Sequence, residues 1–157
     1  MGKFSKRRSG PWYAEDRERI IFEARSREFF PTLRRGLKQL GRRDGLGYLA
    51  DIEVPFYEPR SVEIFFSAHG SGDNPIILSD GPTDSPHRFA DFERRHLCVW
   101  HPDDPPDRRW MRSDGLLALL GQIKLHLFRE AWCRETGEWP GTEAPHFDPN
   151  NGKDPAA

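Results

Sequence analysis

Three side chains capable of acid–base or nucleophilic chemistry lie close together in the stretch RRHLCVWHP, residues 94–102. Cys98 is one of only two cysteines in the chain, and His96 and His101 flank it. A thiol with imidazole neighbours can be a buried apolar residue, a metal ligand or a nucleophile. The types of residue alone leave these three interpretations open, so the surrounding pattern has to separate them.

A metal site would combine these side chains with His87, which lies upstream. Zinc usually takes four ligands in a tetrahedral array. Along a strand, His96 and Cys98 point to one face while His101 points to the other. The second cysteine, Cys133, belongs to a distant predicted helix, where we interpret it as structural. The pattern therefore disfavours a metal site, and we expect none.

A nucleophilic Cys98 fits its position near the end of a predicted strand and shortly before a loop. A reactive cysteine needs partial exposure and neighbours that favour the thiolate, and His101, His96 and His87 are the candidates. Prolines stiffen the loop at 101–109, which could form one wall of a shallow groove. A cysteine protease would instead place its thiol at a helix N-terminus, so that class fits poorly. A buried apolar cysteine stays open as the alternative.

The composition limits the class of protein that carries these residues. A chain of 157 residues predicts one domain, and its many aromatic residues favour a packed core over disorder. The net charge of −1 gives no reason to expect nucleic acid or an anionic membrane as a partner. No apolar run reaches the ~20 residues of a membrane span, and no apolar segment follows the basic start, as a secretory signal requires. Two cysteines without such a signal predict a reducing, cytoplasmic location.

The N-terminal part predicts one helix over residues 13–30, ended by Pro31, and then a short helical piece and a glycine-rich loop over 32–47. Apolar residues of the first helix recur at roughly helical spacing: Ile20, Ile21, Phe22, Ala24 and Phe29. We expect this apolar set to lie in the core, and the alternative is that it docks a partner.

Four strands are predicted next, over residues 48–55, 61–68, 74–80 and 96–100. In the first two, apolar residues alternate with polar ones, which is typical of strands that bury one face. The buried positions should be Tyr48, Ala50, Ile52, Val54, Val62, Ile64 and Phe66. Short turns separate the four segments, which favours an antiparallel meander.

The last element is a helix that begins after Ser113 as N-cap and ends at Gly137. Its core-facing positions should be Leu116, Leu119, Leu120, Ile123, Leu127 and Ala131, with Leu117, Phe128 and Trp132 beside them. The helix should pack on the sheet, which makes the fold class α+β. We predict a domain over 13–146, with Trp139 as an anchor, a basic flexible tail at 1–12 and a disordered tail at 147–157.

The residues around Cys98 are similar to a known pattern. In the ubiquitin-conjugating enzyme family, a His-Pro-Asn segment precedes the catalytic cysteine and a tryptophan introduces the next helix. In SPHRFADFERRHLCVW…RRWMRSDGLLALL, Cys98 matches the cysteine and Trp110 the tryptophan, and His87 lies eleven residues before Cys98, near the position of the motif histidine. Together with the predicted order of a helix, a four-stranded meander and a helix, these residues resemble the ubiquitin-conjugating enzyme fold.

More narrowly, residues 97–146 resemble the stand-alone bacterial ubiquitin-conjugating-like proteins of short type II cyclic-oligonucleotide-based anti-phage signalling systems (CBASS). The resemblance implies an acyl transferase whose Cys98 forms a thioester with the C-terminal glycine of a cGAS-like nucleotidyltransferase. That reaction would regulate cyclic-oligonucleotide synthesis in antiviral defence. It implies no metal or organic cofactor, and activation of the glycine would come from another protein.

The chain departs from the family pattern in one important position, because no asparagine follows His87 as in the His-Pro-Asn segment. That asparagine would help to stabilise the oxyanion, so His87 or His101 would have to serve with Cys98. We interpret His126 and His69 as structural or solvated. The alternative function is a non-catalytic module that docks on the nucleotidyltransferase through its first helix and Trp139.

Overall fold

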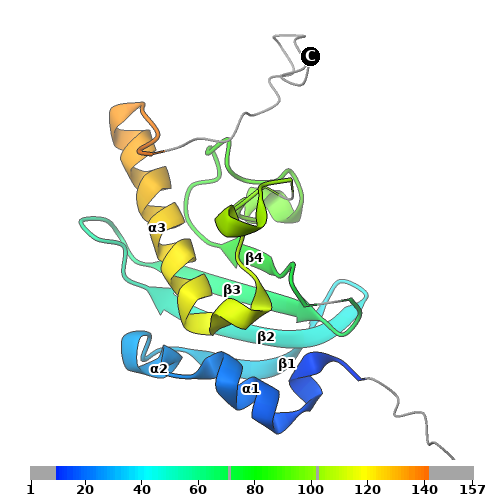
Figure 1. Ribbon diagram of the computed structural model, residues 1–157. Helices are drawn as coiled ribbons and strands as arrows, with labels where there is room; N and C mark the ends of the chain where they lie inside the picture. The colour runs from blue at the N-terminus through cyan, green and yellow to red at the C-terminus, as the bar shows by residue number, and fades with distance from the viewer. Residues whose placement is uncertain (1–9, 71, 102, 142–157) are drawn as a thin grey trace, which may run out of the picture.

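A long helix crosses one face of a four-stranded antiparallel sheet, and two short helices lie along the sheet's first strand (Figure 1). The computed structural model describes residues 10–70, 72–101 and 103–141. The strands follow one another in space as they do in sequence: β1 (Arg34–Leu40), β2 (Arg43–Ile52), β3 (Arg60–Ser67) and β4 (Ile76–Ser79). The α-helices are α1 (Asp16–Glu23), α2 (Ser26–Phe29) and α3 (Gly115–Thr136). Four single-turn 3-10 helices complete the fold: η1 (Trp12–Ala14), η2 (Phe92–Arg94), η3 (Pro106–Arg108) and η4 (Arg112–Asp114). The predicted α+β class is confirmed.

The central strands β2 and β3 bury the face that their alternating sequence predicts. Tyr48 and Ile52 of β2 are fully buried, whereas Leu49 and Asp51 between them are exposed. In the pairing of β2 with β3, Tyr48 lies opposite Ile64, so two buried side chains meet on the core face. The other core residues predicted for this region are also buried: Ala50, Val62 and Phe66 in these strands, and Val54 shortly after the end of β2.

The prediction was wrong about two elements of the sheet. Residues 34–40, which we expected to be helical, form β1, an edge strand whose side chains are mostly exposed. Such a strand buries no face, so its sequence lacks the alternation that identifies a strand. Residues 96–100 do not form a strand, because only His96 and Leu97 make isolated bridges, to Leu78 and Arg88. The four-stranded meander is therefore present, but with β1 as its first strand.

The first predicted helix is broken in two at Arg25, which takes a left-handed conformation with φ of 62°. Phe22 is buried, as expected, but Ile20, Ile21 and Phe29 are more than half exposed, so the prediction that they lie in the core was wrong. Successive residues of a helix turn by about 100°, so the face that buries Phe22 cannot also bury both isoleucines before it. The break then separates Phe29 from that face.

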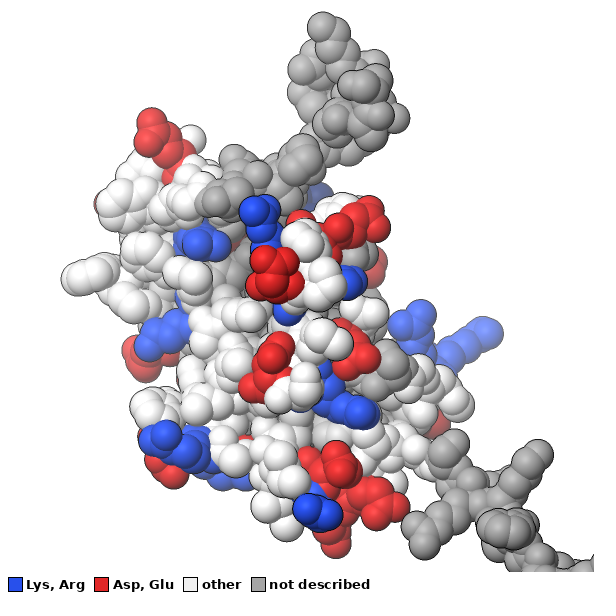
Figure 2. All heavy atoms as spheres, viewed as in Figure 1, with Lys and Arg blue, Asp and Glu red and all other residues white. Residues whose placement is uncertain are grey.

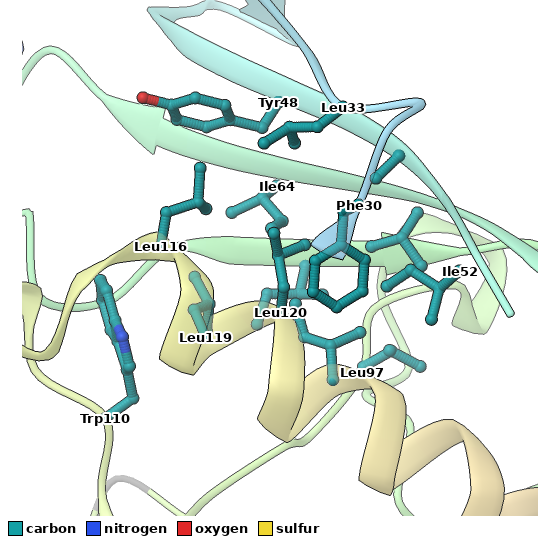
Figure 3. Packing of buried hydrophobic residues seen from close by; sticks show 14 of the residues in the cluster. Phe30, Leu33, Tyr48, Ile52, Ile64, Leu97, Trp110, Leu116, Leu119 and Leu120 are labelled. Carbon is teal, nitrogen blue, oxygen red and sulfur yellow. The ribbon is translucent and has the colours of Figure 1, made fainter. Parts of the chain in front are cut away.

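The C-terminal helix α3 buries all six residues of the predicted core stripe, and Figure 3 shows Leu116, Leu119 and Leu120 directed at the sheet. The helix ends at Gly137, whose φ of 81° is left-handed and whose N–H donates to the Cys133 carbonyl at 2.8 Å. The predicted N-cap at Ser113 was wrong. Ser113 lies inside η4, and the helix begins at Gly115.

Trp12, which the sequence placed in the N-terminal tail, packs against the core through its edge contact with the Phe22 ring, 4.6 Å between centroids. Residues 1–9 and 142–157 lie outside the described residues, and they include most of the predicted N-terminal tail and all of the predicted C-terminal tail at 147–157. None of the helices in the described part of the chain combines the length and apolar character that a membrane crossing requires.

Candidate active site around Cys98

A short antiparallel ladder places Cys98 beside His87. The Cys98 N–H donates to the His87 carbonyl at 2.8 Å, and the Phe89 N–H donates to the His96 carbonyl at 2.9 Å. On the other side, the Leu97 N–H donates to the carbonyl of Ile77 in β4 at 2.8 Å. The ladder thus joins Cys98 to the edge of the sheet. It also brings together two of the three predicted site residues, although eleven positions separate them in sequence.

The chain reverses between the two sides of this ladder through an unusual left-handed turn. Phe92, Glu93 and Arg94 have φ of 49°, 56° and 60°. Each non-glycine residue in this region costs roughly 1–2 kcal/mol, so other contacts must hold the turn. The Arg94 guanidinium supplies them, because it donates to the carbonyls of Thr83 and Ser85, both at 2.9 Å.

A buried ion pair fastens the same segment to α3. Arg88, which lies between His87 and Phe89, donates to both carboxylate oxygens of Glu130, with Nη2 to Oε2 at 2.8 Å and Nε to Oε1 at 3.0 Å. Both side chains are almost inaccessible to solvent. Burial alone would raise the pKa of Glu130, but hydrogen bonds and charge from His126 and Arg88 outweigh it and lower that pKa to about 2. Glu130 is therefore an anion near neutral pH.

The thiol of Cys98 is half-buried, and its Sγ donates to the Trp100 carbonyl at 3.5 Å. Burial raises the pKa of Cys98 above its ordinary value, and the nearby negative charge of Asp104 raises it further. The thiol is consequently protonated at neutral pH, and a nucleophilic role requires a base that removes the proton when a substrate binds.

Replacing Asp104 with asparagine is expected to lower the pKa of Cys98 and to speed its alkylation severalfold near pH 8. The reason is that the negative charge is lost, while the amide oxygen can still accept the hydrogen bond that the His101 N–H now donates at 2.9 Å. Peptide mass spectrometry after timed iodoacetamide exposure measures Cys98 alkylation, with Cys133 as the internal reference. Asp107→Asn on the same loop is the matched control, and an equal effect of both variants would contradict the prediction.

His87 lies under the side chain of Trp139 rather than open to a substrate. Its ring is stacked on Trp139 with 3.7 Å between centroids, and its edge faces His126 at 6.1 Å. Only 5% of His87 is exposed. Trp139 is therefore an anchor, as its sequence position suggested. A catalytic role of His87 stays a prediction, and it would require Trp139 to move.

The other two histidines near Cys98 form their hydrogen bonds elsewhere. The His101 ring is nearly half exposed, and its Nδ1 accepts from the Asp103 N–H at 3.2 Å. The His96 ring lies against Phe89, and its Nδ1 is 2.8 Å from the Asp91 carboxylate. His101 is thus the predicted site histidine that solvent reaches, and its catalytic role also stays a prediction.

An apolar pocket of about 220 Å³ lies alongside residues 96–100. Its walls come from the start of β4, from Phe89 and from the chain on both sides of Cys98, with Leu97, Val99 and Trp100 contributing. The described residues of the loop at 101–109, which we expected to form a groove wall, do not line this pocket. Cys98 itself does not line the pocket, although the residues on both sides of it do.

The possible metal ligands, the charged surface side chains and the two remaining histidines add little to this site. Among the described residues, no three or more His, Cys, Asp or Glu side chains are grouped so that they could hold a metal ion. Figure 2 shows basic and acidic side chains interspersed over one face of the molecule. His126 is buried beside Glu130, and His69 is exposed in a turn.

The residues that sequence reasoning missed are Arg88 and Glu130. One signal was present, because Glu130 stands seven residues after Ile123, and His126 seven after Leu119, so both occupy core-facing positions of α3. A charged residue at a core position indicates a buried partner. Nothing in the sequence identifies that partner as Arg88.

The fold and the site together define an α+β domain with a half-buried thiol that backbone hydrogen bonds place at the edge of its sheet. No protein-family model, no curated protein and no solved structure matches this chain. The function must therefore be argued from the site itself.

Proposed function

We propose that this protein is a ubiquitin-conjugating-like acyl transferase. Cys98 forms a thioester with the C-terminal glycine of a partner cGAS-like nucleotidyltransferase, and this regulates cyclic-oligonucleotide synthesis in bacterial anti-phage defence. The observation that supports the proposal is the placement of Cys98. It follows a four-stranded antiparallel meander, pairs with His87 through its backbone, and precedes a buried tryptophan, Trp110, at the start of the long helix.

In the first step, the thiol of Cys98 loses its proton to a base and Sγ attacks the carbonyl carbon of the activated glycine. An S–C bond forms, and the bond from that carbon to the activating group breaks, with its electron pair leaving on that group. The activated glycine is an acyl adenylate or a thioester supplied by another protein. In the second step, an amine or a second thiol attacks the carbonyl, and Cys98 leaves as a thiolate.

Because burial keeps the Cys98 thiol protonated, the base matters for this reaction. His101 is the better placed of the two predicted histidines, since its ring is nearly half exposed on the loop after Cys98. His87 would act only after Trp139 uncovers it.

Co-expression with the nucleotidyltransferase, followed by reducing and non-reducing gels, tests the proposal. Wild-type protein should give an adduct that disappears under reductant. Cys98→Ser should give an adduct that resists reductant, because the serine forms an ester. Cys133→Ser should behave like wild type. Absence of an adduct from both wild type and Cys98→Ser would overturn the catalytic proposal.

A second candidate function is a non-catalytic docking module, and one observation favours it. Ile20 and Ile21 of α1 and Phe29 of α2 are large apolar side chains that are more than half exposed, and exposed apolar surface can mark an interaction site. For this function, a Cys98→Ala variant should still co-purify with the nucleotidyltransferase, whereas the double change Ile20→Ser and Ile21→Ser should not. Leu37→Ser, at an exposed leucine of β1, is the control.

A further inference from the structure

We infer that Arg88 and Glu130 are positioning residues for Cys98, a role that rests on the proposed function and goes beyond it. The segment between β4 and Cys98 contains no strand or α-helix among its described residues. Its shape therefore depends on a few backbone hydrogen bonds and on side-chain contacts. The Arg88–Glu130 pair is a buried ion pair that joins this segment to α3.

Each N–H group of the Arg88 guanidinium has an acceptor. The Nε–H and one N–H of Nη2 donate to Glu130. The remaining three N–H groups donate to the carbonyls of Ser79 at 3.3 Å, Asp80 at 3.5 Å and Arg94 at 3.5 Å. These carbonyls lie at the end of β4, just after it, and at the left-handed turn. One planar group thus fixes the distances among the sheet edge, the turn and α3.

Arg88 also occupies the middle of the ladder that holds Cys98. It pairs with Leu97, the residue before Cys98, and follows His87, whose carbonyl accepts the Cys98 N–H. A shift of Arg88 along the ladder would therefore move the Cys98 backbone directly. The position of the thiol depends on the same bonds that fix Arg88.

Glu130 reaches the ladder by a second route. The His126 Nε2 lies 3.4 Å from a Glu130 oxygen, and the His126 ring faces the edge of His87. One carboxylate consequently contacts Arg88 directly and contacts a neighbour of His87. His87 and Arg88, which pair with the Cys98 segment, are thus both in contact with side chains of α3.

Stability alone does not account for this pair. Well-packed apolar residues often replace a buried ion pair without loss of stability, because removing two charges from water is costly. An apolar pair cannot form directional hydrogen bonds. It would leave the three carbonyls without the guanidinium donor, and the paired segments of the ladder could shift relative to each other. The geometry therefore points to positioning of Cys98.

The test compares wild type with the double variant Arg88→Met and Glu130→Leu, which removes both charges together. The matched control is Arg25→Met with Glu28→Leu, an exposed ion pair at the start of α2 and outside the Cys98 ladder. Hydrogen exchange of the Cys98 amide reports the ladder, and iodoacetamide alkylation of Cys98 relative to Cys133 reports the thiol. Thioester formation at varied nucleotidyltransferase concentration reports the reaction. Each is measured well below the unfolding temperature of every variant.

We expect the double variant to exchange its Cys98 amide severalfold faster and to alkylate Cys98 faster, while the control matches wild type. The maximal rate of thioester formation should fall on the order of a hundredfold, with little change in the half-saturating concentration, since misplacement by about 1 Å has effects of that size. Arg88→Lys serves if the double variant does not fold. Lysine keeps the positive charge but lacks the planar guanidinium that binds several acceptors at once. Arg88→Lys should therefore also show faster exchange of the Cys98 amide and slower thioester formation.

If the double variant and Arg88→Lys both show the same rates of Cys98 amide exchange and Cys98 alkylation as wild type, the inference is overturned. The two hypotheses fail separately. If wild type forms no thioester, the proposed function fails, yet the exchange and alkylation results still decide whether the pair positions Cys98.

Discussion

Trp110→Ala is expected to lower the free energy of unfolding by about 3–5 kcal/mol, the usual cost of truncating a fully buried large aromatic residue. Only 1% of Trp110 is exposed, and its ring centroid lies about 6 Å from those of Phe22 and Phe66. Its Nε1 donates to the Gly115 carbonyl at 2.9 Å, which gives the buried indole N–H a partner at the first residue of α3. Figure 3 shows the indole beneath the start of that helix.

Chemical denaturation of the wild type and of three variants measures this effect. Trp110→Phe keeps most of the apolar surface but loses the hydrogen bond to Gly115, so its loss should be clearly smaller than that of the alanine variant. Trp132→Ala, at a tryptophan that is 41% exposed, should cost much less. If Trp110→Ala unfolds at the same denaturant concentration as Trp132→Ala, Trp110 is not the core residue that joins the Cys98 loop to α3.

The parts of the fold that the sequence predicted well are those with one buried face. In α3, Leu116, Leu120 and Ile123 recur at helical spacing because that face packs on the sheet, and in β2 Tyr48 and Ile52 alternate with polar residues for the same reason. In each case the pattern of side chains follows from burial. The relation between pattern and burial is local to each element, so it does not depend on contacts elsewhere in the chain.

The parts that the sequence did not predict have no such periodicity. The strand β1 forms because its backbone pairs with β2 from Arg34 to Leu40. Its side chains are mostly exposed, and its residue types are also compatible with a helix. The residue that breaks the first helix in a left-handed conformation is Arg25. A glycine at this position would have indicated the break in the sequence, but an arginine does not. Both features depend on contacts made elsewhere in the chain.

The same reasoning applies to the candidate site. The proximity of Cys98 to His87 was expected from a family resemblance, and the backbone ladder brings them together. The stacking of His87 under Trp139 could not be predicted, because it joins two residues outside regular strands and helices that lie 52 positions apart. The Arg88–Glu130 pair is similar, since 42 positions separate its members. Sequence therefore indicates the reactive residue better than the residues that hold it.

Acidification should remove a substantial part of the protein's stability through Glu130. Its pKa of about 2 lies below the ordinary value of 4.5, so the carboxylate is favoured in the folded state. A depressed pKa gives stability that is present above pH 4.5 and is lost as the pH falls through 4.5 toward 2. The size of this contribution is about 3 kcal/mol, from roughly 1.4 kcal/mol for each pH unit of difference. Loss of one charge from the Arg88 pair also leaves the other uncompensated.

Glu130→Gln separates this effect from general acid sensitivity. At pH 7 the variant should be less stable than wild type, and the gap should narrow as the pH falls toward 2, because glutamine does not titrate. Glu23 contributes its own acid sensitivity in both proteins. Burial raises the pKa of Glu23, but hydrogen bonds from Arg35, Tyr48 and Arg27 outweigh that and lower it. The comparison at fixed pH cancels this contribution. Urea denaturation at a series of pH values gives the gap, with the exposed Glu28→Gln as control. A gap between wild type and Glu130→Gln that stays constant from pH 7 to pH 2.5 would show that the Glu130 carboxylate is not held ionised by Arg88 and His126.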